Sequence, residues 1–190
     1  TSLSNLGIED LFLDPNDDFT LYAGTLSHGV FTSTDGGESW IPTNEGLPAE
    51  KEKAVLYQSA QGTLFVAVKT RGGVSLYRSA NAGRSWQEVI QPYAASSISY
   101  IGSDPRAADT ILVGRETGLY RLQPDTGNWN RISINYGKVS AEAVAFSSNG
   151  SDTYIATHGG ILRSPDGEGG WSYHERGLLS PFIRTLAADP

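Results

Sequence analysis

Four tryptophans divide the chain into nearly equal parts, and this spacing constrains the fold more than any other feature. They stand at positions 40, 86, 129 and 171, at intervals of 46, 43 and 42 residues. Short apolar runs precede each tryptophan in the same order. Self-similarity with a fixed period of roughly 20–50 residues is typical of repeat architectures. The sequence therefore predicts four copies of one structural unit.

Each copy is expected to form four short strands. In the first copy these are Ile8–Leu13, Leu21–Thr25, Val30–Ser33 and a last strand that begins at Ser39-Trp40. Runs of β-branched, aromatic and aliphatic residues, broken by Gly, Asn and Asp, favour strands over helices. Four-stranded units that repeat in the low forties of residues are typical of the blades of a β-propeller.

The predicted fold class is an all-β propeller segment of four-stranded antiparallel blades. We expect one domain over residues 1–190, with blades at about 6–48, 52–92, 96–136 and 140–181. The start of the chain also repeats near its end, since Ile8 and Leu11 match Ile183 and Leu186 at a shift of 175 residues. Residues 182–190 are therefore predicted to be the first, inner strand of a fifth unit.

How such a set of blades completes itself is left open by the sequence. A sheet of this size has too small a core to stand alone and must stack on its neighbours. The chain begins at Thr1 and contains no Met, as expected of a processed or excised chain. Three arrangements are compatible with the repeat: a segment of a longer protein, a pairing with another copy or fragment, and closure as a disc of four blades.

The turn between the third and fourth strands carries a recurring motif. It reads STDGGESW at 33–40, SANAGRSW at 79–86, LQPDTGNW at 122–129 and SPDGEGGW at 164–171. These turns resemble the Asp-box (BNR) repeat, whose pattern is Ser/Thr, any, Asp, any, Gly, any, Ser/Thr, Trp/Phe. The positions that carry the resemblance are Ser33, Asp35, Gly37 and Trp40; Ser79, Asn81, Gly83 and Trp86; Asp125 and Trp129; and Ser164, Asp166 and Trp171.

We interpret these turn residues as structural. A short carboxylate or amide such as Asp35 or Asn81 accepts hydrogen bonds from backbone N–H groups further along and closes a tight loop. The glycines supply the positive φ that such a loop requires. Each indole is expected to bury about 200 Å² against an adjacent blade, and its removal to cost roughly 3–5 kcal/mol. One acid per turn lacks the partners that acid–base chemistry needs.

Candidate ligand-binding residues lie at the opposite end of the blades. The resemblance to Asp-box propellers implies that ligands are handled there, near the central axis. Cationic, acidic and imidazole side chains that converge on such an axis could hold a sugar or a peptide carboxylate. The competing interpretation is that these residues are charged only because turns are hydrated. The candidates are His28, Lys69, Arg71, Arg115, Glu116 and His158.

No catalytic residue is predicted. Among Asp-box enzymes, sialidases carry a Phe/Tyr-Arg-Ile-Pro motif that the chain lacks. The phrase STDGGESW followed by Glu45–Pro48 is similar to xyloglucan-type endoglucanases, but glycoside hydrolysis needs two facing carboxyls, and Glu116 has no evident partner. We therefore expect a non-catalytic module that docks protein or glycan. The alternatives are a fragment of a glycan-cleaving glycoside hydrolase and a purely structural repeat.

Composition excludes several other functions. The net charge of −7 argues against nucleic acid or an anionic membrane as a partner. The absence of Cys excludes disulfides and Cys-ligated metals. Two histidines with two blades between them make a poor metal site, so neither cofactor nor metal is expected. No apolar run reaches the roughly 18–20 residues of a membrane span. The family resemblance implies an extracytoplasmic or secreted location, with self-association or further blades as additional partners.

Overall fold

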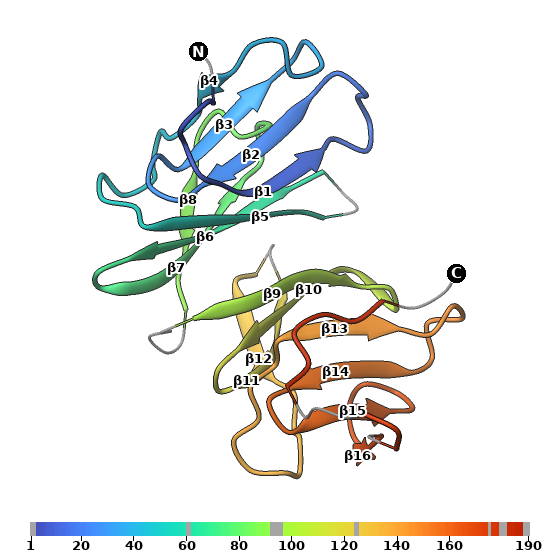
Figure 1. Ribbon diagram of the computed structural model, residues 1–190. Helices are drawn as coiled ribbons and strands as arrows, with labels where there is room; N and C mark the ends of the chain where they lie inside the picture. The colour runs from blue at the N-terminus through green and yellow to red at the C-terminus, as the bar shows by residue number, and fades with distance from the viewer. Residues whose placement is uncertain are drawn as a thin grey trace. The chain divides into compact units, whose positions relative to one another are not determined.

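The computed structural model contains four antiparallel sheets, each built from four strands that are consecutive in the sequence (Figure 1). The residues that the structure describes are 3–59, 62–91, 97–123, 126–174, 176–178 and 182–187. In this part of the chain, no helix is long and apolar enough to cross a membrane. The sheets are the predicted blades, and the chain divides into two compact units, Thr1–Ala95 and Ser96–Pro190.

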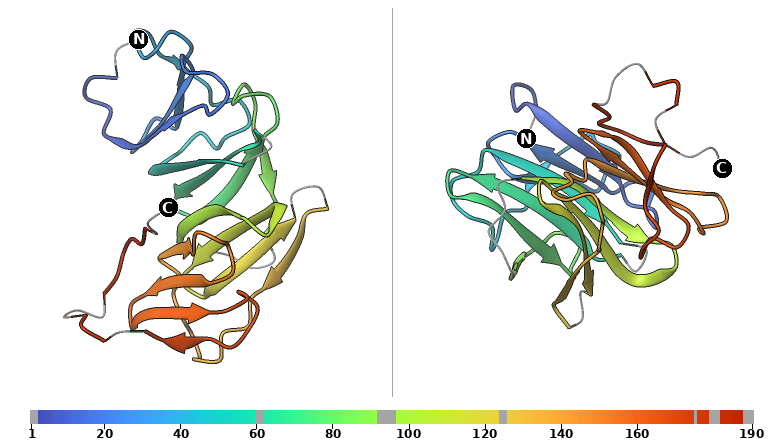
Figure 2. Two further views of the ribbon diagram at one scale, coloured as in Figure 1. Left: turned by 90° about the vertical axis from the view of Figure 1, so that its right-hand side faces the viewer. Right: turned by 90° about the horizontal axis from the view of Figure 1, so that it is seen from below.

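Unit 1 holds the first two blades. Blade 1 consists of β1 (Ile8–Leu13), β2 (Leu21–Thr25), β3 (Val30–Ser33) and β4 (Ile41–Pro42). Blade 2 consists of β5 (Lys53–Gln58), β6 (Leu64–Thr70), β7 (Gly73–Ser79) and β8 (Gln87–Val89). The sheets of the two blades face one another, and β5 lies beside β1 and β2 (Figure 2).

Unit 2 repeats this arrangement with the other two blades. Blade 3 consists of β9 (Ile98–Asp104), β10 (Ala107–Arg115), β11 (Gly118–Gln123) and β12 (Asn128–Arg131). Blade 4 consists of β13 (Ala143–Phe146), β14 (Thr153–Thr157), β15 (Gly160–Ser164) and β16 (Ser172–Tyr173). Within this unit, β13 lies beside β9.

The first three strands of blade 1 have the bounds that the sequence predicts, but the fourth strand begins later than expected. The ladder of β4 starts at Ile41, one residue after Trp40. The indole Nε1 of Trp40 donates to the Gly37 carbonyl at 3.1 Å, so this tryptophan belongs to the turn. In blade 3, by contrast, Trp129 lies within β12 and pairs with Leu122.

The strand expected at the end of the chain is not formed in the residues that the structure describes there. Residues 182–187 carry no β-ladder, and Ala188 lies outside the described residues. The backbone N–H of Ile183 donates to the Thr157 carbonyl at 3.4 Å. A strand requires a neighbouring edge that offers a continuous row of hydrogen bonds, and one bond at the end of β14 does not provide such a row.

The core of each unit lies between its two blades. Each sheet turns one face, made of alternate residues, toward the other sheet of the unit. In unit 1 the buried cluster contains Tyr22, Val30, Ala54, Leu56, Leu64, Val66, Val68, Tyr77 and Trp86. In unit 2 it contains Leu112, Leu119, Ile132, Val139, Ala141, Val144, Ile155, Leu162 and Trp171. Both clusters include the tryptophan of the second blade of the pair.

Two glycines allow the inner strands of neighbouring blades to approach closely. A Cβ on Gly24 in β2 would lie 2.3 Å from the carbonyl oxygen of Ala54 in blade 2. A Cβ on Gly114 in β10 would lie 2.4 Å from the carbonyl oxygen of Ala141, which leads into blade 4. Both contacts involve backbone atoms, so no change of rotamer can make room for a side chain.

Polar side chains at the junction of unit 1 centre on a phenol. The Tyr22 hydroxyl lies 3.3 Å from Oδ2 of Asp14, which also accepts a hydrogen bond from Gln58 of blade 2 at 3.3 Å. Burial of Tyr22 raises the pKa of its hydroxyl to about 12, and the negative charge of Asp14 adds to this effect. The neutral phenol is therefore the stable form in this junction.

The junction of unit 2 has an ionic network at the corresponding place. Asp104, whose side chain is buried, accepts hydrogen bonds from Arg106 at 2.9 Å and from Arg121 at 3.3 Å. Arg121 continues to Glu168 of blade 4 at 2.6 Å, and Arg106 lies over the ring of Phe146 at 5.6 Å. Burial alone would raise the pKa of Asp104, but the hydrogen bonds and charges of the two arginines outweigh it and lower that pKa.

Candidate functional site

The Asp turns of blades 1 and 2 share one hydrogen-bond pattern. In blade 1, Ser33 Oγ donates to Asp35 Oδ1 at 2.7 Å, and Asp35 Oδ1 accepts the N–H of Ser39 at 2.9 Å. In blade 2, Ser79 Oγ donates to Asn81 Oδ1 at 2.8 Å, and Asn81 Oδ1 accepts the N–H of Ser85 at 3.0 Å. The amide of Asn81 thus replaces the carboxylate of Asp35 without a change in the turn.

The turn of blade 4 differs by one residue. Ser164 Oγ accepts the N–H of Gly167 at 2.8 Å, three residues on, whereas in blade 1 Ser33 accepts that of Gly37, four residues on. Gly167 has φ +71°, so it supplies the positive φ although Glu168 stands at the position where the motif expects Gly. In the turn of blade 3, Asp125 lies outside the described residues.

The carboxylates of these turns are held in their ionised form. The hydroxyl of Ser39, its backbone N–H and the hydroxyl of Ser33 lower the pKa of Asp35 to about 2. The backbone N–H groups of Gly169 and Glu168 lower the pKa of Asp166. A carboxylate that is stabilised as an anion by its own turn is a poor proton donor, which supports a structural role for both residues.

The four tryptophans have two kinds of surroundings. Trp86 and Trp171 are 4% and 6% exposed and belong to the cores between blades. The indole Nε1 of Trp86 donates to the carbonyl of Thr43 in the preceding blade at 2.8 Å. Trp40 and Trp129 are only half-buried, and Trp129 packs edge-on against Tyr120 of its own blade at 6.5 Å. Of the four tryptophans, Trp86 and Trp171 are therefore the two that are buried against the preceding blade of their unit.

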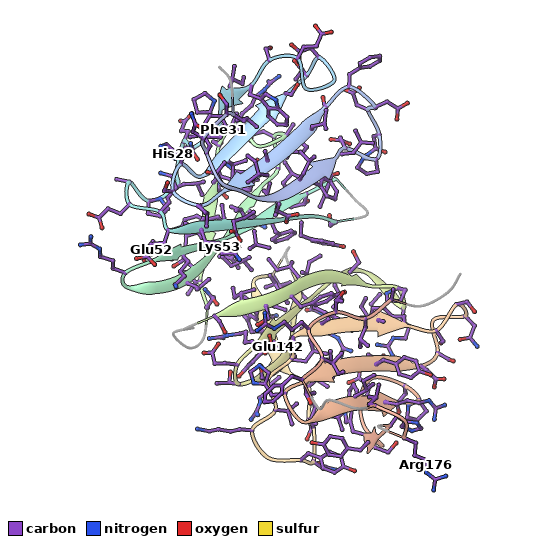
Figure 3. All side chains as sticks on the ribbon, in the orientation of Figure 1. His28, Phe31, Glu52, Lys53, Glu142 and Arg176 are labelled. Carbon is purple, nitrogen blue, oxygen red and sulfur yellow. The ribbon has the colours of Figure 1, made fainter. Side chains whose placement is uncertain are left out.

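We use the term loop end for the end of each blade where the second and third strands are joined. In unit 1 the predicted residue His28 lies at this end (Figure 3), as do Lys69 and Arg71 where β6 is joined to β7, and all three are exposed. His28 Nδ1 lies 3.0 Å from Ser27 Oγ, and Lys69 Nζ lies 3.7 Å from Glu52. Both contacts are exposed and therefore weak.

Arg115 differs from the expectation for a binding residue. Its side chain is fully buried, on the face of β10 opposite to the core of unit 2, and its guanidinium lies over the ring of Tyr120 at 5.1 Å. Tyr120 in turn shares a hydrogen bond with Thr117 at 3.0 Å. The sequence grouped Arg115 with Glu116 in the loop that follows the strand, and the structure makes Arg115 the last residue of β10.

Two carboxylates lie at the loop end of unit 2. Glu116 accepts hydrogen bonds from the backbone N–H and the hydroxyl of Ser97 at 3.0 and 2.9 Å. Glu142 (Figure 3) accepts a hydrogen bond from Ser140 and lies 3.2 Å from Nε2 of the exposed His158. Each carboxylate is thus occupied by its own partners.

Aromatic side chains complete this end of unit 2. Tyr136 and Tyr173 are partly exposed and meet edge to face at 4.7 Å. A Cβ on Gly159, next to His158, would lie 3.4 Å from the Tyr173 hydroxyl. Arg131 donates to the carbonyl of Thr117 at 2.9 Å. We call the set Glu116, Arg131, Tyr136, Glu142, His158 and Tyr173 the loop-end cluster.

The predicted site residues are therefore divided between the two units. Glu116 and His158 belong to the loop-end cluster, Arg115 lies buried in β10, and His28, Lys69 and Arg71 lie in unit 1. No sequence signal linked Tyr173 to His158, because the two meet through the folding of β15 and β16. In the described part of the chain, no group of three or more His, Asp or Glu side chains could hold a metal ion.

Solved structures with a similar fold include both enzymes and proteins of other kinds. The extracellular domain of the one-component system BT4673 from B. thetaiotaomicron is 18% identical, with TM-score 0.72, over 96% of this chain and 25% of that one. The Niastella koreensis GH74 enzyme is 20% identical, with TM-score 0.64, over 87% and 30%. YCF48 from Cyanidioschyzon merolae is 19% identical, with TM-score 0.67, over 95% and 62%. YCF48 has also been solved bound to D1 peptide.

These similarities establish the fold. The chain forms four blades of a β-propeller and spans less than two thirds of the length of each of these structures. No protein-family model matches the sequence, and no curated protein matches it.

Proposed function

We propose that the chain is a non-catalytic binding module that docks a protein segment on the loop-end cluster of unit 2, and that its four turns are Asp-box (BNR) repeats. The observation that carries the proposal is the partly exposed Tyr136–Tyr173 pair beside the exposed His158. Tyrosine offers a large apolar ring together with a hydroxyl, and it is enriched at binding surfaces for this reason.

The charges around the tyrosines suit a peptide. At the loop end of unit 2, Arg131 donates to the Thr117 carbonyl and Glu142 lies beside His158, and the charged groups of a bound peptide could replace these partners. Glycan docking is the neighbouring possibility, because sugars also stack on tyrosine rings. The D1 peptide bound to YCF48 favours a peptide.

Hydrolysis is less compatible with the two carboxylates. A glycosidase needs one carboxyl that carries a proton and a second that attacks or activates water. Two donors from Ser97 hold Glu116, and Ser140 and His158 hold Glu142. Each of the two carboxylates is thus engaged by partners of its own within unit 2. An extracytoplasmic location is part of the proposal, supported by the extracellular domain of BT4673.

Selection from a random peptide library on the immobilised chain tests the proposal. We expect enriched peptides whose affinity falls at least about tenfold in Tyr136→Ala and Tyr173→Ala, the loss typical of an aromatic anchor. His28→Ala, an exposed residue at the loop end of unit 1, is the matched control and should bind as the wild type does. Equal loss in the control, or no enrichment at all, would refute the site.

The enzymatic alternative has a separate readout. Fluorogenic sialosides and β-glucans are incubated with the wild-type chain and with Glu116→Gln. Turnover that this substitution abolishes would replace the binding module by a glycoside hydrolase, whereas absence of turnover together with peptide enrichment supports docking.

A further inference from the structure

We use the term outer face for the face of blade 1 that points away from the core of unit 1. This face exposes apolar side chains at positions of the repeat that are buried in blades 2 and 4. In three of the blades, one residue of the first strand pairs with the third residue of the second strand, and these residues can be compared. They are Leu11 in blade 1, Leu56 in blade 2 and Val144 in blade 4. Leu56 and Val144 are 6% exposed because they pack against the preceding blade of their unit, whereas Leu11 is 59% exposed. The face that carries Leu11 thus has the composition of a junction between blades.

Two further residues show the same difference. Leu13, on the same face of β1 as Leu11, is also exposed. Trp40 is half-buried, whereas its counterparts Trp86 and Trp171 are buried in the cores between blades. Blade 1 therefore has exposed leucines and a half-buried indole at positions of the repeat where blades 2 and 4 join a preceding blade.

At the other end of the chain, the segment 182–187 lies where the first strand of a following blade would begin. The N–H of Ile183 donates to the carbonyl of Thr157, the last residue of β14. The N–H of Ala141, which leads into blade 4, donates in the same way to the carbonyl of Arg115, the last residue of β10. Ile183 thus makes the same kind of backbone hydrogen bond to blade 4 that Ala141 makes to blade 3.

This terminal segment also has the sequence pattern of β1. Ile183 and Leu186 repeat the spacing of Ile8 and Leu11. The ring of Phe182 lies 5.8 Å from that of His158, which adds an exposed contact. The backbone hydrogen bond between the segment and β14 is long, at 3.4 Å, and we expect a complete blade that makes a full junction to displace the segment.

We propose that blade 1 of one copy of this chain packs on blade 4 of a second copy, with β1 taking the place of residues 182–187. A second copy is the occupant because it supplies the matching face. On blade 4, Tyr154 and Ile161 have the register positions of Tyr22 and Val30, which form the receiving face in unit 1. Both are only half-buried. The terminal segment is then a competitor that weakens the association of copies.

The first experiment releases the terminal segment in the full chain. Ile183→Pro removes the N–H that donates to Thr157. Thr185→Pro is the control, because it introduces the same proline ring two residues later in the segment and leaves that hydrogen bond in place. In sedimentation equilibrium we expect head-to-tail association to strengthen at least about tenfold in Ile183→Pro and to stay at the wild-type level in Thr185→Pro. A chain that remains monomeric in Ile183→Pro would overturn the proposal.

The second experiment tests the face of β1. In the Ile183→Pro background, Leu11→Asp should return the chain to the monomer, because it places a charge in the centre of the apolar face. Ile41→Asp is the matched control, since Ile41 is 60% exposed and lies in the same sheet on the face of Tyr22. Equal effects of the two substitutions would contradict the proposal. Circular dichroism checks that both variants are folded.

Cross-linking defines which faces meet and does not depend on a charged variant. The chain has no Cys, so introduced thiols report only on each other. A mixture of Leu11→Cys chains and Ala143→Cys chains should give a disulfide-linked dimer. In unit 1, Leu56 of blade 2 has the register position of Leu11, and Asp10 of blade 1 has that of Ala143. Leu56 and Asp10 are joined by a hydrogen bond, so the two thiols should also meet. Ile41→Cys mixed with Ala143→Cys should give none. A dimer of Leu11→Cys alone would show that two copies of blade 1 meet instead, and would overturn the head-to-tail arrangement.

Discussion

The two units solve the same packing problem with different side chains. Both bring the inner strands together at a glycine, Gly24 in unit 1 and Gly114 in unit 2, against a backbone carbonyl of the next blade. The neighbouring polar group is a neutral phenol, Tyr22, in unit 1 and a buried carboxylate, Asp104, in unit 2. The backbone distance is common to both, whereas the polar chemistry is not.

This difference shows which positions the fold constrains. A backbone approach leaves no room for a Cβ, so only glycine fits. A buried polar group requires only that its hydrogen bonds be satisfied, and either a phenol with Asp14 and Gln58 or a carboxylate with two arginines meets that condition. Blades can therefore diverge widely in sequence and still stack in the same way.

The largest expected effect distinguishes the second blade of each unit from the first. Trp86→Ala and Trp171→Ala should each lower the free energy of unfolding by about 3–5 kcal/mol, because each leaves a cavity between blades. Trp40→Ala and Trp129→Ala remove half-exposed indoles and should cost about 1–2 kcal/mol. Urea unfolding of the four variants measures this. Equal costs at all four positions would mean that the tryptophans act only within their own turns.

The next effect tests what the two units share. Gly24→Ala and Gly114→Ala should each destabilise the chain by about 1–3 kcal/mol, since the added methyl meets backbone atoms that cannot rotate away. Gly169→Ala is the control, because no atom lies within 4 Å of a Cβ built there, and it should change stability by less than about 0.5 kcal/mol. Thermal unfolding provides the comparison. A tolerated alanine at one position alone would show that the two junctions differ in their backbone as well.

The smallest effect is a pH dependence of opposite sign in the two units. Tyr22 has a pKa of about 12 in the folded chain, above its ordinary value, so its contribution is complete below pH ~10 and is lost as the pH rises toward 12. The pKa of Asp104 is lowered, so its contribution is present above pH ~4 and is lost as the pH falls through the folded-state pKa.

Denaturation across the pH range separates the two contributions. Tyr22→Phe should flatten the alkaline loss of stability and leave the acid loss unchanged. Asp104→Asn should flatten part of the acid loss and leave the alkaline one unchanged. An alkaline loss that persists in Tyr22→Phe would assign it to another group.

Local patterns in the sequence located most of the fold. The bounds of β1, β2 and β3 follow from runs of apolar residues between turn residues, and the structure has the same bounds. The turns at Asp35 and Asn81 also have the hydrogen bonds that their side chains predict. Such features need contacts over only a few residues, so they are written in short stretches of chain.

The candidate site was predicted less completely. Glu116 and His158 were selected because they lie in turns at one end of the blades, and the structure places both there. Tyr173 was missed because its neighbours, Tyr136 and Gly159, come from other loops. Arg115 was grouped with the following loop, but it is the last residue of β10 and its side chain is buried, which residue type and position in the sequence did not indicate.

The sequence by itself determined the period, the strands and the chemistry of each turn, because these depend on residue spacing and on hydrogen bonds between near neighbours. Only the tertiary structure decided which tryptophans are buried, that Gly24 and Gly114 meet the backbone of the next blade, and that the terminal segment forms no strand. These outcomes depend on contacts between segments tens of residues apart, and the packing free energy of such contacts exists only once the sheets are stacked.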